Sequence, residues 1–248
     1  MAAPTDQMVI NYWKWEIQFH EPYDPTTNIT DPHIDPATNS IFLMEPADVN
    51  KNNFPPLINK GSQTNPLPIP ANTKILIVLQ GAFFDTDDKA NVMTGSVNKS
   101  QAAKESYNTG TIESQLSVDG NVSASVTGEL CPGANPPLAP ILGGDCVWEH
   151  STGNDFLIDI PTNTHKKHLH PHNFGMIHDH DTPSNGNQAF SAGSHGYYAV
   201  LPGFAPNTTH TINYHLKVTR DQNCPHGEGS PKSPDVFESS NITYHVKT

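Results

Sequence analysis

The sequence predicts an all-β domain, a β-sandwich or jelly-roll-like fold with one short helix and long ordered loops. The chain of 248 residues contains 23 Pro and 17 Gly, and only 15% of its residues are charged, a composition typical of short strands joined by many turns. Its apolar residues fall in short alternating or continuous runs, as strands require. No internal segment reads as a free linker, so we expect residues 1–248 to form a single domain.

The first predicted strand covers Met8–Phe19, where aromatic residues including Trp13 and Trp15 recur at period two. We interpret these aromatics as core, with stacking on a ligand as the alternative. Residues 20–70 follow, dominated by Pro, Asn and Asp with short apolar islands. We expect them to wrap the core as an extended ordered loop, because they are too apolar to be wholly disordered.

The most buried strand is predicted at Lys74–Gln80, which is continuously apolar and β-branched. A short helix follows over 100–109, opened by a cap at Ser100. Two alternating arms about Asp119-Gly120 predict a hairpin over Leu116–Val126. Later strands are predicted at Phe156–Ile160, His195–Leu201, His210–Val218 and Ile242–Val246.

Charge and hydropathy exclude two classes of partner. The formal net charge of −12 repels phosphate backbones and anionic lipid, so we expect no nucleic-acid partner. No run approaches the roughly 18 to 20 apolar residues that span a bilayer. The first residues lack a basic segment followed by an apolar one, so we expect any signal peptide to be absent from this sequence. We expect a secreted or cell-surface protein on the grounds that follow.

Cysteines and glycosylation sequons fit an exported protein. Cys131 and Cys146 bracket a Pro/Gly-rich loop, and a disulfide closing a loop of about 15 residues stabilises by about 3 kcal/mol in the chain-entropy model. Cys224 is then free or paired with one of the other two. Sequons of the form Asn-x-Ser/Thr occur at Asn28, Asn98, Asn121, Asn207 and Asn241.

The strongest chemical signal is a histidine-rich stretch from His165 to His180, within a predicted insertion at 161–190. Residues two apart on a strand share a face, so His168 with His170 and His178 with His180 each form a two-imidazole edge. A hairpin that pairs 170 with 178 and 168 with 180 would place all four on one face, with opposed Cβ atoms about 4.5–5.5 Å apart.

Such a set predicts a copper or zinc site, since neutral imidazole suits these ions. Asp179 and Asp181 are candidate acceptors that orient the rings from outside the ligand shell. The alternative is a solvated polar loop that binds no specific ion. Additional candidate ligands are His165, His172 and Met176.

Two groups of aspartates supply the hard oxygen ligands that Ca²⁺ prefers, with an ordinary turn as the alternative for each. They are Asp85, Asp87 and Asp88 after the buried strand, and Asp24, Asp31 and Asp35 among prolines.

Four motifs together resemble a little-characterised family of exported β-sandwich proteins of archaea and bacteria. They are Tyr12-Trp-Lys-Trp15, the strand Pro70–Leu76, the turn Leu116–Gly120 and the closing segment Gly196–Ile212. The resemblance covers most of the chain and implies an exported β-sandwich. It implies no activity and no role for the histidines.

We therefore expect an exported metal-binding β-sandwich protein. The first alternative is a structural or adhesive extracellular protein that assembles by strand or loop exchange, strengthened by metal. The second is a calcium-dependent carbohydrate-binding module that uses Trp13, Trp15 or Trp148. Gly-x-Ser-x-Gly, phosphate-loop and His-Glu-x-x-His motifs are missing from the sequence, so any catalytic residues are unknown at this level.

Overall fold

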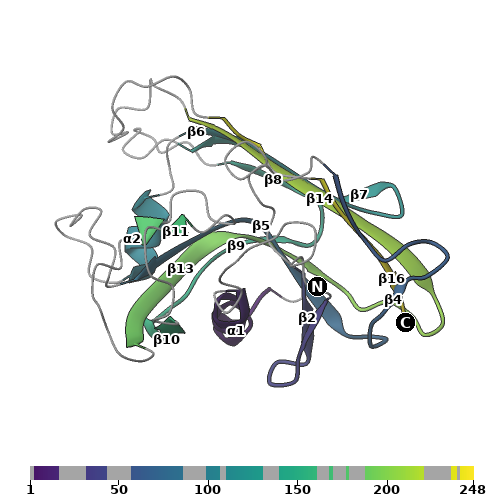
Figure 1. Cartoon of the computed structure of the whole chain (residues 1–248). Coiled ribbons are helices and arrows are strands. Elements are labelled where there is room, and N and C mark those ends of the chain that lie inside the picture. The colour runs from purple at the N-terminus through teal and green to yellow at the C-terminus, as the bar shows by residue number, and fades with distance from the viewer. Residues whose placement is uncertain are drawn as a thin grey trace.

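The computed structural model shows two large β-sheets, a two-stranded ribbon and two helices (Figure 1). The two sheets form two layers, as predicted for a sandwich-like all-β fold. The residues that the structure describes are 3–16, 32–43, 57–85, 99–106, 110–130, 140–160, 168–169, 177–178, 188–220, 236–238 and 241–248.

The first sheet is built on two long antiparallel strands, β5 and β13. On the far side of β5 lies β2, which runs parallel to it and pairs with β1. Along the opposite edge of β13, β9 and β10 follow one another as an interrupted edge strand. The bounds are β1 His33–Asp35, β2 Ser40–Phe42, β5 Lys74–Asp85, β9 Val147–Ser151, β10 Phe156–Ile160 and β13 Gln188–Leu201.

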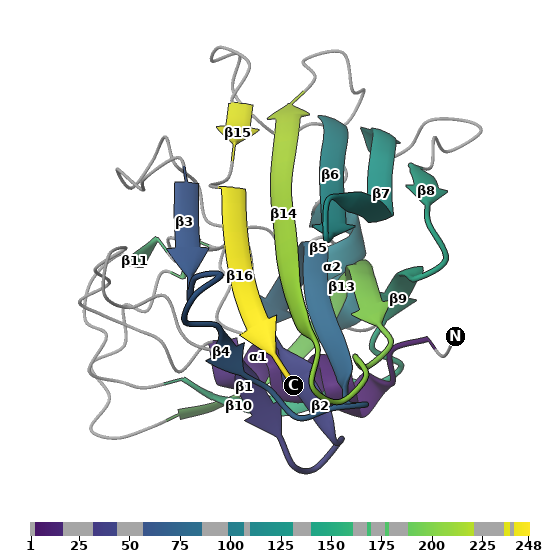
Figure 2. The same cartoon turned by 90° about the vertical axis from the view of Figure 1, so that its right-hand side faces the viewer.

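The second sheet has the order β3-β16-β14-β6-β7-β8, and Figure 2 shows these strands side by side. Two short strands extend it, since β15 pairs with β14 and β4 pairs with β16. The bounds are β3 Leu57–Lys60, β4 Leu67–Pro68, β6 Gly110–Val118, β7 Asn121–Leu130, β8 Ile141–Gly143, β14 Thr209–Arg220, β15 Val236–Glu238 and β16 Asn241–Lys247.

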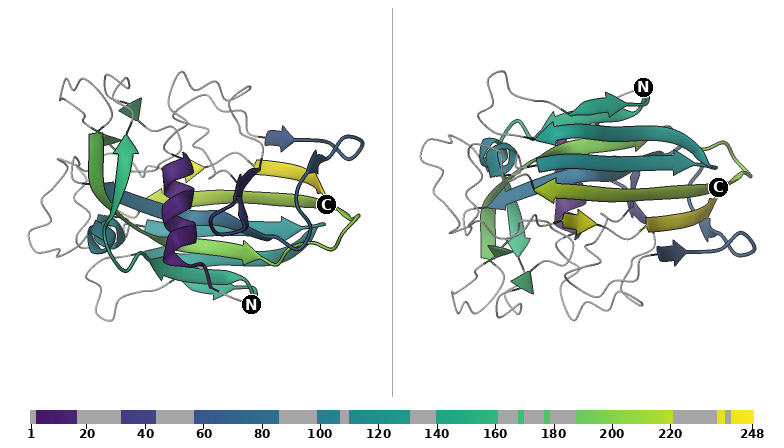
Figure 3. Two further views of the ribbon diagram at one scale, coloured as in Figure 1. Left: turned by 90° about the horizontal axis from the view of Figure 1, so that it is seen from below. Right: turned by 90° about the horizontal axis from the view of Figure 1, so that it is seen from above.

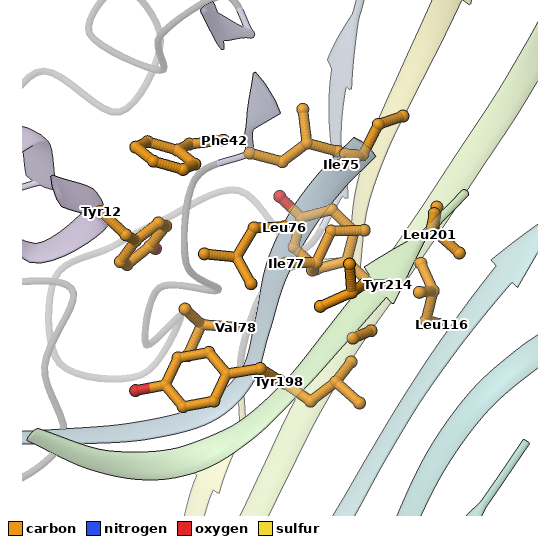
Figure 4. Close-up of a cluster of buried hydrophobic side chains, with 14 of the residues drawn as sticks. Tyr12, Phe42, Ile75, Leu76, Ile77, Val78, Leu116, Tyr198, Leu201 and Tyr214 are labelled. Carbon is orange, nitrogen blue, oxygen red and sulfur yellow. The ribbon is translucent and has the colours of Figure 1, made fainter. Parts of the chain in front are cut away.

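The core lies on both faces of β5, as its continuous apolar sequence predicts. Figure 4 shows Leu76 and Val78 of β5 beside Tyr12, whereas Tyr214 and Leu116 of the second sheet lie on the other side of the strand. All five side chains are fully buried. The predicted buried strand is therefore confirmed.

The predicted hairpin is present as β6 and β7, and both arms are longer than expected. Asp119 and Gly120 have φ values of 52° and 79°, the two left-handed residues that a two-residue hairpin turn with the right twist needs. The Asp119 carboxylate also accepts a 2.8 Å hydrogen bond from the backbone N–H of Thr211. The turn is thereby tied to β14, which pairs with β6.

The first predicted strand is wrong, because its described residues form helix α1, Asp6–Glu16. Thr5 caps this helix, since its Oγ1 accepts a 3.2 Å hydrogen bond from the backbone N–H of Met8. The buried positions recur every three or four residues, which is the helical period. They are Met8, Val9, Tyr12, Trp13, Trp15 and Glu16.

Figure 3 shows α1 crossing the outer face of the first sheet. Trp13 has no exposed surface, and its Nε1 donates to the hydroxyl of Tyr198 in β13 at 3.4 Å. Gly81 of β5 leaves room for the ring, because a Cβ there would lie 2.9 Å from Cζ2 of Trp13. With Trp15 also buried, neither tryptophan can stack on a sugar, and the core interpretation is confirmed.

Helix α2, Lys99–Ser106, confirms the short helix predicted over 100–109. Figure 1 shows it between the two sheets where they diverge. Ser100 lies inside the helix, so its predicted role as a cap is wrong. The backbone N–H of Lys99 instead donates at 2.8 Å to Oδ1 of Asp155, in the interruption between β9 and β10.

The described parts of 20–70 contain four short strands, β1 to β4, at the edges of both sheets. The prediction of a wrapping loop therefore missed these strands, because two to four residues are too few to show an alternating pattern. Among the described residues, neither helix combines the length and apolarity needed to cross a membrane.

Candidate functional site

Two short strands bring part of the histidine segment together. They are β11, His168–Leu169, and β12, Ile177–His178, which pair antiparallel. His168 lies opposite His178, and Leu169 lies opposite Ile177. The hairpin is therefore present, and its register differs by two residues from the predicted pairing of 170 with 178 and 168 with 180.

The observed register has a physical reason in the sequence. It opposes two apolar residues, Leu169 and Ile177, and cross-strand apolar pairs stabilise a ladder. A shift of two residues leaves each residue on the same face, because side chains alternate with period two. Outside the described residues lie the other predicted ligands and acceptors, His165, His170, His172, Met176, Asp179, His180 and Asp181.

Among the described residues, no three His, Cys, Asp or Glu side chains gather closely enough to hold a metal ion. Asp35, one of the calcium candidates, is held in a turn. Its carboxylate accepts hydrogen bonds from Asn11, from the backbone N–H of Ala37 and from the hydroxyl of Thr38. These bonds outweigh burial and lower the pKa of Asp35, so its turn interpretation is the better one. Asp85 ends β5, and the candidates Asp24, Asp31, Asp87 and Asp88 lie outside the described residues.

Cys146 is a buried free thiol, 4% exposed, and the predicted disulfide with Cys131 is corrected. Its Sγ–H donates to the carbonyl of Ser123, near the beginning of β7, at 3.0 Å. Cys131 lies outside the described residues, but it follows Leu130, the last residue of β7.

The Cys146 thiol also lines a surface hollow of about 410 Å³, whose other lining residues include Val118, Val122 and Phe204. Burial raises the pKa of this thiol, and the charge of Asp145 raises it further. The sulfur is therefore protonated at neutral pH and is a poor nucleophile. Nothing in this hollow supports covalent chemistry by cysteine.

Three of the five glycosylation candidates lie within the described residues, and all three are exposed: Asn121, Asn207 and Asn241. Asn28 and Asn98 lie outside them. Exposure is compatible with glycosylation, which stays a prediction.

A polar cluster that the sequence did not predict lies on the inner face of the first sheet. His195 of β13 is 3% exposed, with Nδ1 2.7 Å from Oγ of Ser151 and Nε2 3.8 Å from Oε1 of Glu149. Lys104 of α2 donates to the same Glu149 oxygen at 3.2 Å. Tyr197, next on this face of β13, is 5% exposed. Hydroxyl, imidazole, carboxylate and ammonium groups therefore meet in one place, and the Tyr197 ring lies beside the imidazole.

The strand register explains this convergence. His195 pairs with Ser151, and Tyr197 pairs with Glu149, and residues two apart on a strand share a face. Gly193 lies on the same face, where a Cβ would overlap the backbone of Lys99 and Ser100 in α2. The glycine therefore lets α2 approach the strand closely enough for Lys104 to reach Glu149.

Burial keeps His195 neutral. It lowers the pKa of the imidazole to about 4, and although Glu149 opposes the shift, Lys104 and His150 add to it. A carboxylate can only accept a hydrogen bond, so the proton of the neutral ring is assigned to Nε2, facing Glu149. Nδ1 then carries a lone pair and accepts the hydroxyl proton of Ser151.

Two other histidines make charge-assisted contacts. Nε2 of His150 donates to Oδ1 of Asp6 in α1 at 2.8 Å, on the outer face of the first sheet. In the second sheet, Nδ1 of His210 donates to Oδ2 of Asp119 at 2.7 Å, and its Nε2 lies 2.9 Å from Oγ1 of Thr208. Both contacts join elements that lie far apart in the sequence.

The sequence offered little signal for the His195 cluster. His195 lies within a strand that was correctly predicted, but its partners Ser151 and Glu149 come from β9, which was not predicted.

Comparisons of the chain with protein-family models, with curated proteins and with solved structures identify no match. The family resemblance drawn from motifs stays a prediction, and function is argued from the geometry.

Proposed function

We propose that the chain is a metal-binding β-sandwich protein that holds copper or zinc on its histidine ribbon, the pair of strands β11 and β12. The observation that carries the proposal is the pairing of His168 with His178 across β11 and β12. Directly opposed residues of an antiparallel pair have Cβ atoms about 4.5–5.5 Å apart, a separation from which two imidazoles can share one ion. The proposed site includes His170 and His180, each two residues from a paired histidine in the sequence.

The donor set favours late transition metals. Imidazole nitrogen is a borderline ligand that suits Zn²⁺ and Cu²⁺, and affinity for divalent ions peaks at copper. Four histidine ligands would fill a tetrahedral site and fit storage or sequestration. Three would leave a position for water, and with it hydrolytic or redox chemistry.

The test is metal content after loading. Protein purified without a histidine-affinity step is incubated with Cu²⁺ or Zn²⁺, passed through gel filtration and analysed by mass spectrometry for bound metal. We expect close to one ion per chain, lost in the double variant His168→Ala/His178→Ala. Binding should also weaken below about pH 6.5, as protons compete for imidazole.

The matched control is His215→Ala/His245→Ala, which removes two histidines from β14 and β16 of the second sheet. This variant should keep the ion. Retention of equal metal by the His168/His178 variant, or none by the wild-type protein, would contradict the proposal.

The alternative function, self-assembly through a sheet edge, also has an observation in its favour. β8 is an edge strand, and its Ile141 and Leu142 are 72% and 41% exposed. Exposed apolar edges favour pairing with another chain. Sedimentation of the same loaded samples separates the two functions, since metal-dependent growth in mass supports assembly and constant mass supports a metal site within one chain.

A further inference from the structure

Ser151, His195 and Glu149 meet where the edge strand of the first sheet is interrupted. Ser151 ends β9, and β10 resumes at Phe156. The serine is exposed, and among the described residues its hydroxyl has one hydrogen-bond partner, Nδ1 of His195 at 2.7 Å. An exposed hydroxyl bonded to a buried neutral imidazole is the basic unit of an activated serine.

The interruption is held in place from both sides of the sheet. Oδ2 of Asp6 in α1 accepts a hydrogen bond from the backbone N–H of Gly153 at 2.9 Å. Asp155 accepts from Lys99 of α2 at 2.8 Å. Thr152 donates through its backbone N–H to the carbonyl of Ser194 at 2.9 Å, so the ladder continues past Ser151. The hydroxyl is therefore presented from a fixed backbone, as nucleophilic catalysis requires.

We propose that this cluster is an esterase site in which Ser151 is the nucleophile, His195 is the general base and Glu149 positions the imidazole. The activity is separate from the proposed metal site and uses none of its residues. Glu149 is itself held by Lys104 at 3.2 Å. Its contact with Nε2 of His195 is 3.8 Å, and catalytic hydrogen bonds are often long in enzymes without substrate.

The reaction balances with water as the second substrate. Ser151 Oγ forms a bond to the ester carbonyl carbon as its proton passes to Nδ1 of His195. The tetrahedral intermediate collapses, the bond to the leaving oxygen breaks, and the imidazolium returns the proton to that oxygen. Water then attacks the acyl group in the same way, releasing the carboxylic acid and restoring the Ser151 hydroxyl.

A second hydroxyl–imidazole–carboxylate set, Thr208–His210–Asp119, shows what distinguishes the Ser151 site. The Thr208 hydroxyl donates at 2.7 Å to the carbonyl of Ala205. Its proton is therefore already used within the β13–β14 connection, and His210 cannot take it. Ser151 has no such competing acceptor among the residues that the structure describes.

The environment of His195 selects the substrate class. Burial lowers the imidazole pKa to about 4, so it is a weak base and assists best where the leaving group departs readily. We therefore assign aryl and other activated esters, and not amides, as substrates. The charged and titratable groups that face His195 from the described elements are Glu149 of β9, Lys104 of α2 and Tyr197 of β13, while His150 acts on its charge from the opposite face of β9.

The experiment uses the full chain in EDTA, so that bound metal contributes nothing. Hydrolysis of p-nitrophenyl acetate is measured, and a fluorophosphonate probe is located by peptide mass spectrometry. We expect one label per chain at Ser151, and at least tenfold slower hydrolysis in Ser151→Ala. The rate should rise with pH through an acidic limb near pH 4, because His195 must be neutral.

Three variants make the outcome specific. Ser123→Ala, in β7 of the second sheet, and His168→Ala/His178→Ala should hydrolyse the ester at the wild-type rate. Glu149→Gln should lower kcat with KM unchanged, and should move the acidic limb to lower pH, because a charge that favours the imidazolium is lost. Equal hydrolysis by wild-type and Ser151→Ala protein, or probe attached elsewhere, would overturn the esterase proposal and leave the metal proposal untouched.

Discussion

Glu16 shows how one residue can make stability depend on pH. It lies at the end of α1 with 3% of its surface exposed. Burial raises the pKa of its carboxyl from 4.5 to about 7, against the opposing effect of the nearby Tyr12 hydroxyl. The folded state therefore holds a proton that the unfolded chain releases near pH 4.5.

A carboxyl whose pKa is raised in the folded state stabilises the protein at pH values below its unfolded-state pKa. That stabilisation is lost as the pH rises through its folded-state pKa. Glu16→Gln keeps the size of the side chain and removes its charge. We predict that the free energy of unfolding of this variant increases relative to that of the wild type as the pH is raised from 5 to 8. The gain should reach at most about 3 kcal/mol, at 1.36 kcal/mol per pKa unit. Urea unfolding at the two pH values measures it.

The control is Glu113→Gln, at an exposed position of β6, which should show no comparable change between the two pH values. If Glu16→Gln and wild-type protein differ by the same amount at pH 5 and pH 8, Glu16 is not protonated in the folded state and the prediction fails.

At the scale of residues, the sequence predicts sites made by neighbouring residues. It does not predict sites whose residues lie far apart in the sequence and are brought together by strand pairing. The histidines of the ribbon are neighbours in the sequence, so their clustering was visible in advance. Ser151 and His195 are 44 residues apart, and they meet because β9 pairs with β13 in one particular register. Residue spacing carries no signal for such a pairing.

At the scale of elements, success followed the strength of local signals. The β6–β7 hairpin was predicted because Asp119-Gly120 supplies the two left-handed residues of its turn. The α1 segment failed because tryptophans at 13 and 15 satisfy period two, while the wider pattern satisfies the helical period. Thr5 followed by Asp6 was the neglected cue, since a cap and an acidic first turn favour helix.

The contact between α2 and β13 depends on a glycine. A Cβ at Gly193 would overlap the backbone nitrogen of Ser100 and the carbonyl carbon of Lys99. Backbone atoms in a helix cannot turn aside as a side chain can, so the whole helix must move. Because α2 covers the face that carries His195, its displacement would also admit water to the imidazole.

We therefore predict that Gly193→Ala destabilises the protein by about 1–3 kcal/mol, the usual cost of overpacking. It should also raise the pKa of His195 from about 4 toward the ordinary 6.5, because hydration favours the charged form. Denaturant unfolding and an NMR titration of the histidines measure the two effects.

Gly153→Ala is the matched control, because a Cβ there would meet only the end of the Asp6 side chain, at 3.2 Å. It should cost less than Gly193→Ala and should leave the titration of His195 in place. Equal effects of the two substitutions would mean that close packing of α2 on Gly193 does not govern this end of the sheet.

At the scale of the molecule, one hydrophobic core joins the two sheets. Residues of α1, of the first sheet and of the second sheet belong to a single buried cluster, with Leu116 and Tyr214 packed across from β5 (Figure 4). A shared core is the physical basis for cooperative unfolding of the two sheets, and the single domain over residues 1–248 stays a prediction.

Leu116→Ala tests this cooperativity, because all three tryptophans report on the other layer: Trp13 and Trp15 lie in α1 and Trp148 in β9. The substitution leaves a cavity beside β6 and should lower the free energy of unfolding by about 2–5 kcal/mol. We predict that the urea unfolding midpoints measured by tryptophan fluorescence and by far-ultraviolet circular dichroism fall together to the same lower value.

The control is Val122→Ala, at a position 57% exposed in the same sheet, which should shift neither midpoint. A fluorescence midpoint that stayed at the wild-type value while the dichroism midpoint fell would mean that the sheets unfold separately.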